Sequence, residues 1–181
     1  MRSLLLFLLA LVLAPAAGDD LHYSGDGRML RPANYREWIW LSSGIGMSYT
    51  PQAGAPANPS FDNVFVNPAA YRSFSQTGKW PDKTIFVLEQ RASQSSGSIN
   101  RSGRFQTTLL GLDIHVKDES RFPGKWAFFN FNASDSSAAM IAVTASCYSC
   151  HAQHGAVDTT FVQFYPTLLD IAQQKKTLRQ Y

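Results

Sequence analysis

The sequence of 181 residues is poor in cysteine and in charge. Its only two cysteines are Cys147 and Cys150, so a framework of several disulfides is excluded. Charged residues make up 16% of the chain, the net charge is +3, and no Arg/Lys cluster with interleaved aromatics is present. Nucleic acid is therefore not an expected partner. A glycine-rich phosphate loop and an internal repeat are also missing.

Long hydrophobic runs are missing after the first residues of the chain. Met1-Arg2 is a positively charged start, residues 3–13 are apolar but too short to span a bilayer, and residues 14–18 are mostly small. This pattern predicts a signal peptide over residues 1–18 and a single exported domain over residues 19–181. We expect a periplasmic or secreted bacterial protein without membrane contact once the signal is removed; an uncleaved anchor is the alternative.

The two cysteines belong to the motif Cys147-Tyr148-Ser149-Cys150-His151. A Cys-x-x-Cys-His sequence is typical of covalent haem c attachment. Both thiols bond to the porphyrin, and the adjacent histidine binds its iron through a ring nitrogen. The motif predicts haem c as the cofactor, held by Cys147 and Cys150, with His151 as the metal ligand.

Other interpretations of the cysteine pair need features that the sequence does not supply. A redox dithiol is expected at a helix N-terminus in a βαβ pattern. A disulfide across so short a loop would be strained. A zinc site needs two further ligands, and only His154 is nearby.

The remaining pattern predicts an α+β fold, with a mostly antiparallel β-sheet, flanking helices and a C-terminal helix for haem attachment. Asn67-Pro68 is a typical helix start and Gly78 a typical helix end. Further helices are expected at residues 31–38 and from Pro166 to about residue 176. Strands are expected at residues 39–43, 64–66, 84–91, 104–117 and 126–131, and a loop at 134–137. Leu110, Leu112 and Ile114 should share one face of their strand.

Eight short segments of the sequence carry a family likeness. In chain order they are NYREW (34–38), FVNPAAY (65–71), GKWPDKT (78–84), VLE (87–89), VKD (116–118), GKWAF (124–128), CYSCH (147–151) and FVQFYP (161–166). Together these segments resemble the cytochrome P-460 family, which includes cytochrome c′-beta. The resemblance implies a high-spin, five-coordinate haem with His151 on one side, an open opposite face, and commonly a homodimer. One kind of member has a lysine bonded to the porphyrin and oxidises hydroxylamine; the other binds nitric oxide or carbon monoxide in an apolar pocket.

Position 88 decides between these two kinds, because the resemblance implies a lysine there in the cross-linked members. This chain has Leu88. Lys83 and Lys79 are close in sequence. Lys83 is five residues from Leu88 and so should point to the other face of a regular strand, whereas a shifted register would still allow a lysine to reach the porphyrin. If Leu88 faces the haem, Phe86 and Gln90 lie on the same side, and Phe86 and Leu88 are our candidate contacts to the cofactor.

The opposite side of the haem is less well defined by the sequence. Phe61, Phe65 and Phe128 are expected to close an apolar lid, and Met29, Met47 and Met140 to be filler rather than ligands. His22 is placed in the N-terminus, His115 is expected to be an ordinary surface or capped histidine near a strand end, and His154 to contact a propionate or solvent. Glu89 should face away, Asp62 and Asp113 have no assigned place, and no catalytic base is identified.

The leading hypothesis is an exported mono-haem protein that binds nitric oxide, carbon monoxide or a related nitrogen oxide. The first alternative is an enzyme that oxidises hydroxylamine. The second is an electron-transfer cytochrome with a redox partner protein, which would need a second axial ligand.

Overall fold

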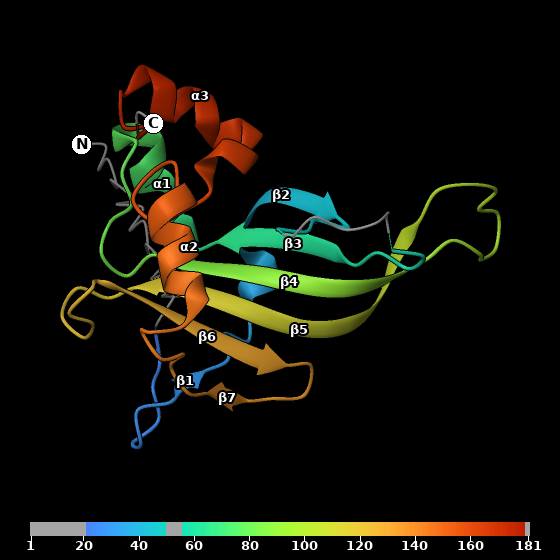
Figure 1. The fold of residues 1–181 in the computed structure, drawn as a ribbon, viewed down its shortest axis with the longest axis horizontal. Helices are drawn as coiled ribbons and strands as arrows, with labels where there is room; N and C mark the ends of the chain where they lie inside the picture. The colour runs from blue at the N-terminus through green and yellow to red at the C-terminus, as the bar shows by residue number, and fades with distance from the viewer. Residues whose placement is uncertain (1–20, 50–55, 180–181) are drawn as a thin grey trace, which may run out of the picture.

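The computed structural model describes residues 21–49 and 56–179 (Figure 1). The predicted signal peptide therefore lies outside the described residues. In the two described ranges, no helix has the length and apolar character needed to cross a membrane.

The centre of the fold is an antiparallel sheet of five strands in the order in which they occur along the chain. The strands are β2 (Ile39–Ile45), β3 (Phe61–Val66), β4 (Ile85–Gln94), β5 (Phe105–Lys117) and β6 (Trp126–Asn132). A small second sheet pairs β1 (Met29–Leu30) with β7 (Ser137–Ala138). The α+β prediction with an antiparallel sheet is confirmed.

Three α-helices gather at one end of the sheet, away from the long β4–β5 hairpin (Figure 1). They are α1 (Pro68–Thr77), α2 (Ser146–His154) and α3 (Pro166–Gln174), with short 3₁₀ turns η1 (Tyr35–Glu37) and η2 (Val162–Phe164). Helix α1 begins with Pro68 after Asn67 and ends at Gly78, which is left-handed with φ +70°. These helix signals predicted both ends of α1 correctly because they act locally.

Two local predictions are wrong. The helix expected at residues 31–38 is only the turn η1, because Tyr35 at its start and Trp38 directly after it are buried in the core and the chain is already extended at Ile39. The loop expected at 134–137 ends in β7, whose pairing with β1 depends on a partner more than 100 residues away.

Different parts of the chain pack against the two faces of the sheet. We call one the N-terminal face, because its residues pack with Tyr35 and Trp38; it includes Ile85, Val87, Leu112, Ile114, Val116 and Phe129. We call the other the helix face, because its residues pack with α1 and α3; it includes Val66, Phe86 and Trp126. Alternation along each strand then assigns the neighbouring residues to one face or the other.

A bulge in the β4–β5 pairing changes one expectation. Gln90 pairs with Gly111, but Arg91 pairs with Leu109, so Leu110 is the extra residue. The side chains of Leu112 and Ile114 are buried, whereas Leu110 is 49% exposed. The prediction that all three share one face of the strand fails at Leu110, because the bulge interrupts the alternation.

Glu89 on the N-terminal face is a buried charged residue, with 3% of its surface exposed. Its carboxylate accepts hydrogen bonds from the Tyr35 hydroxyl at 2.5 Å, Arg36 at 2.6 Å, Arg91 at 2.8 Å and Asn63 at 3.2 Å. Burial alone would raise the pKa of Glu89, but the Tyr35 and Arg91 hydrogen bonds and the two guanidinium charges outweigh it and lower this pKa.

Replacing this carboxylate should weaken the fold in a pH-dependent way. A lowered pKa means that ionised Glu89 stabilises the folded state above about pH 4.5, its ordinary pKa, and that this contribution is lost as the pH falls through the folded-state pKa. We expect Glu89→Gln to lower the free energy of unfolding at pH 7 by about 2 kcal/mol and to flatten its acid dependence, measured by urea unfolding from pH 3 to 7. The exposed Glu37→Gln is the control; equal losses in both variants would contradict the expectation.

Candidate functional site

Helix α2 presents the cysteine and histidine side chains of the motif on its inner side. Its only residues that are not exposed are Cys147, Tyr148, Cys150 and His151, all half-buried. The Tyr148 hydroxyl donates to the Ile141 carbonyl at 3.0 Å and accepts from the Phe128 amide at 3.3 Å, which joins α2 to β6. Both cysteine thiols are free.

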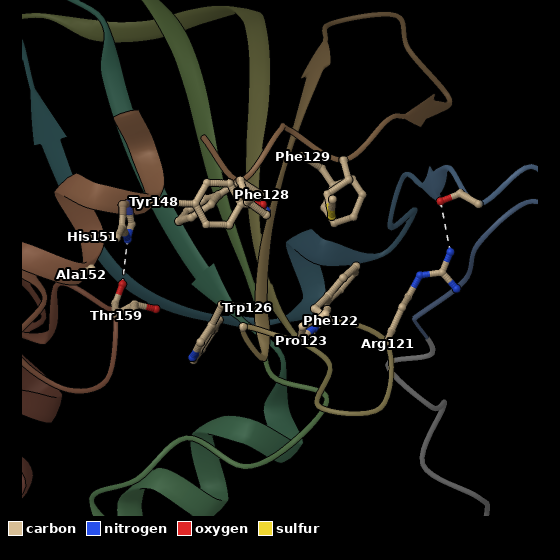
Figure 2. Close-up of a pocket in the computed structure, with 14 residues that line it drawn as sticks. Arg121, Phe122, Pro123, Trp126, Phe128, Phe129, Tyr148, His151, Ala152 and Thr159 are labelled. Carbon is tan, nitrogen blue, oxygen red and sulfur yellow. Dashed lines mark hydrogen bonds between the residues drawn. The ribbon is translucent and has the colours of Figure 1, made fainter. Parts of the chain in front are cut away.

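The His151 ring is fixed by one hydrogen bond to the chain. Its Nδ1 lies 2.7 Å from the carbonyl oxygen of Thr159 (Figure 2). A carbonyl can only accept, so Nδ1 carries the proton and Nε2 keeps its lone pair. Burial lowers the pKa of His151, although the bond to Thr159 works against this shift, so the ring is neutral at pH 7. A neutral imidazole with a free Nε2 lone pair is the form that binds a metal.

Aromatic rings surround this imidazole. The centroid of the His151 ring lies 4.3 Å from Phe161, 4.6 Å from Phe128 and 4.8 Å from His115. The ring of Tyr49 stacks on Phe161, with 6.4 Å between their centroids. Phe128 is therefore near the site, as expected for a residue of the helix face.

His115 is not the surface histidine that we expected. It is buried, with its ring stacked on Phe128 at 4.0 Å and close to Trp126 at 4.3 Å. Burial, and to a smaller extent the neighbouring His151, lowers the pKa of His115 well below its ordinary value, so it is neutral. The position of His115 near a strand end did not indicate that its ring is buried, because the residues that cover the ring belong partly to α2, which lies far along the chain.

Phe86 and Leu88 share the helix face, as alternation predicts. Phe86 pairs with His115 across the sheet and is buried beside Trp80 at 4.7 Å and Tyr165 at 6.1 Å. It thus touches His115 rather than His151. Leu88 is half-buried two residues further along β4.

The row of side chains across the sheet at Leu88 is largely polar. Leu88 lies between Val64 and Asp113, and Asp113 pairs with Asn130. The Asp113 carboxylate accepts from Asn130 Nδ2 at 2.6 Å and from Gln90 Nε2 at 3.2 Å. The apolar surroundings expected for Leu88 are therefore found only on its Val64 side.

Asp62, which the sequence left without a place, lies on this same helix face. It pairs with Gln90 in the next row across the sheet. Burial first, and then the charge of Asp113, raises the pKa of Asp62. Partial burial raises the pKa of Tyr49, and the charges of Asp62 and Cys150 add to this shift, so Tyr49 lies close to both groups. Asp62 and the motif thus approach the same tyrosine.

The other members of the expected lid lie on the wrong side of the sheet. Phe65 pairs with Val87 and packs against Tyr35 at 5.8 Å on the N-terminal face. Phe61, four residues before Phe65, pairs with Arg91 on that face as well. The lid of three phenylalanines is therefore wrong, because only Phe128 shares a face with His151. The expectation that Glu89 points away from the site is confirmed by its contacts with Tyr35 and Arg36.

The two lysines near Leu88 in sequence are directed elsewhere. Lys83 has a left-handed backbone, with φ +63°, and its Nζ contacts the Asp118 carboxylate and the Ser120 hydroxyl. Lys79 is exposed in the turn after α1.

The three candidate methionines differ in their exposure to solvent. Met29 is buried in the core of the N-terminal face, whereas Met47 and Met140 are both 42% exposed.

An apolar cavity of about 870 Å³ adjoins the other side of His151, between α2 and the β6 edge (Figure 2). Trp126, Phe128, Phe129 and Met140 form much of its wall, and Tyr148, His151 and Ala152 contribute from α2. Neither cysteine lines it. Two regions next to α2 could therefore accommodate a bound group. One is the region beside the thiols, near Tyr49, and the other is this cavity.

The chain matches one protein-family model, described as Cytochrome P460, over residues 32–162. This range is well over half of the chain and includes the sheet, α1 and the whole of α2. No curated protein matches the chain.

Gly155, directly after α2, lies so close to neighbouring backbone atoms that a larger residue should disturb the packing of the site. An added Cβ would lie 2.7 Å from the His151 carbonyl oxygen, 2.8 Å from the Thr159 carbonyl carbon and 2.9 Å from the Thr160 nitrogen. Its φ of −67° suits alanine, so the cost is purely steric.

We expect Gly155→Ala to lower the free energy of unfolding by about 1–3 kcal/mol, measured with urea. The matched control is Gly124→Ala, whose Cβ meets no atom within 4 Å. A loss in Gly155→Ala no larger than in the control would show that the close approach is not important for stability.

Proposed function

The chain belongs to the cytochrome P460 family, and we propose that it is an exported mono-haem protein whose five-coordinate haem binds small neutral ligands such as nitric oxide or carbon monoxide. Family membership implies haem c. When bound, haem supplies an iron position for such a ligand and a centre that exchanges one electron.

The donor set on α2 carries this proposal. Cys147 and Cys150 are free thiols one helical turn apart, and His151 follows at once with Nε2 unprotonated. These residues fit haem c: the two thiols would attach the porphyrin and His151 Nε2 would bind the iron. The Thr159 carbonyl would hold the imidazole in the required tautomer.

The placement of two other candidate ligands, His115 and Met29, supports an open sixth position. The ring of His115 packs beside His151 and on Phe128, so it would serve as a neighbour of the iron ligand rather than as a second ligand. Met29 is buried on the opposite face of the sheet. Met140 lines the cavity next to His151, and the five-coordinate spectrum expected below requires that it does not bind the iron.

The surroundings of β4 support ligand binding without a lysine cross-link. Leu88 has no nucleophilic atom, and the Lys83 amino group pairs with Asp118. Export is supported by the residues at 1–18, because thiols intended for haem attachment are processed outside the reducing cytoplasm. A homodimer remains part of the proposal because the family resemblance implies it, and a redox partner protein belongs to the electron-transfer alternative.

Spectra of the purified holoprotein test the proposal. We expect an intact mass that includes one covalent haem, a high-spin five-coordinate ferrous spectrum, and conversion to a six-coordinate species with carbon monoxide. His151→Ala should lose the histidine-ligated spectrum, whereas His154→Ala, on the same helix but exposed, should retain it. A mass without haem, a low-spin spectrum before ligand is added, or a lysine-linked haem peptide would each overturn the proposal.

One observation favours oxidation of hydroxylamine as a second candidate function. Such a reaction needs a group that accepts a proton from the substrate. Asp62 is a partly buried carboxylate on the helix face whose pKa is raised by burial and by Asp113, which brings its proton affinity closer to that of a general base working near neutral pH.

Replacing Asp62 tests this second candidate. If the ferric holoprotein oxidises hydroxylamine, we expect Asp62→Asn to lower kcat by about 100-fold or more, the usual contribution of a general base. Asp170→Asn is the control, since Asp170 is exposed on α3. Turnover is measured with a soluble electron acceptor; turnover unaffected by Asp62→Asn would remove Asp62 from this role.

A further inference from the structure

The loop of residues 155–160, which we call the proximal loop, connects α2 to the segment before η2 and carries the carbonyl that binds His151. Its backbone closes on itself: the Thr160 amide donates to the Val157 carbonyl at 3.0 Å, and the Ala156 amide to the Thr160 carbonyl at 2.9 Å. Asp158 at its tip has a left-handed backbone, with φ +59°.

Three consecutive residues of the proximal loop are each held by a different side chain from the body of the protein. The Lys117 Nζ lies 3.1 Å from the Asp158 carboxylate and also donates to the Trp80 carbonyl at 2.9 Å. The indole of Trp80 donates to the Thr160 hydroxyl at 2.8 Å.

The middle residue, Thr159, connects the two histidines. Its hydroxyl lies 3.4 Å from His115 Nε2, and its carbonyl accepts from His151 Nδ1 at 2.7 Å. The His115 ring is itself held by stacking on Phe128 at an interplanar angle of 10°. One face of the sheet thus fixes the atom that orients the candidate iron ligand.

We propose that His115 and Lys117 are positioning residues for His151, which act by holding the Thr159 carbonyl in place. A hydrogen bond from Nδ1–H to a fixed carbonyl makes an imidazole a stronger electron donor to its metal. The anchors of the proximal loop therefore set the strength of the iron–histidine bond. This inference rests on the proposed function, because it requires haem bound through His151.

The experiment removes the Thr159–His115 contact from each side. Thr159→Val deletes the hydroxyl but keeps the carbonyl, and His115→Phe keeps a ring on Phe128 but deletes the nitrogen. In each ferrous holoprotein, resonance Raman spectroscopy measures the iron–histidine stretching band, and a redox titration measures the reduction potential. We expect both variants to shift the band to lower frequency, to raise the potential and to change carbon monoxide affinity by about tenfold.

The double variant shows whether the two residues act through one contact. If they do, its shifts are no larger than those of the more affected single variant, rather than their sum. Lys117→Met, which releases Asp158, should shift the same band by a separate route. It keeps the test available if His115→Phe does not fold. Ile114→Val is the control, because Ile114 is fully buried on the opposite face of β5; it should lower the melting temperature and leave the band unchanged.

The outcomes separate this inference from the proposed function. Wild-type protein without covalent haem, or with haem not bound by His151, refutes the proposed function. Haem bound by His151, with a stretching band that Thr159→Val, His115→Phe and Lys117→Met leave in place, refutes only the positioning role. Shifts in the two single variants that add in the double variant refute the shared contact.

Discussion

The hydrogen bond between His151 and the Thr159 carbonyl is the interaction on which the candidate site depends. It joins the attachment helix α2 to the loop that follows it, and it fixes which imidazole nitrogen keeps a lone pair. The donor and the acceptor are eight residues apart, and the loop between them is partly closed by its own backbone hydrogen bonds. His115 and Lys117 on β5, and Trp80 in the segment between α1 and β4, hold this loop from outside.

The alternation of the sheet divides the polar chemistry of the protein into two separate groups. On the N-terminal face, the charge of Glu89 is compensated by two arginines and a tyrosine, which makes it a structural group. On the helix face, burial first and then the charge of Asp113 raise the pKa of Asp62, while Asp113 accepts hydrogen bonds from the neutral amides of Asn130 and Gln90. Neighbouring positions on β3 and β4 therefore serve different purposes, because successive side chains point in opposite directions.

The sequence predicts what is encoded locally. The spacing from Cys147 to His151, the Asn67-Pro68 start of α1 and the Gly78 end need only adjacent residues. The five strands of the main sheet followed from the apolar residues and turn signals along the chain. The sequence could not place Phe61 and Phe65 relative to His151, since this depends on the register of β3 with β4. It also missed the role of His115, because the cover of that ring comes from a helix more than 30 residues further on.

If the proposed ligand binds on the helix face, the charges near Leu88 would restrict which kind of ligand it is. Asp62 and Asp113 lie in neighbouring rows of one face, and the described contacts of Asp113 are the neutral amides of Asn130 and Gln90. An anion brought close to these carboxylates would be repelled, and more strongly where water is excluded. A neutral diatomic molecule experiences no such cost and needs no strong hydrogen-bond donor. The same carboxylates could accept protons from a substrate that is oxidised. The two candidate functions therefore make different demands on Asp62: ligand binding needs no proton acceptor there, whereas oxidation of hydroxylamine does.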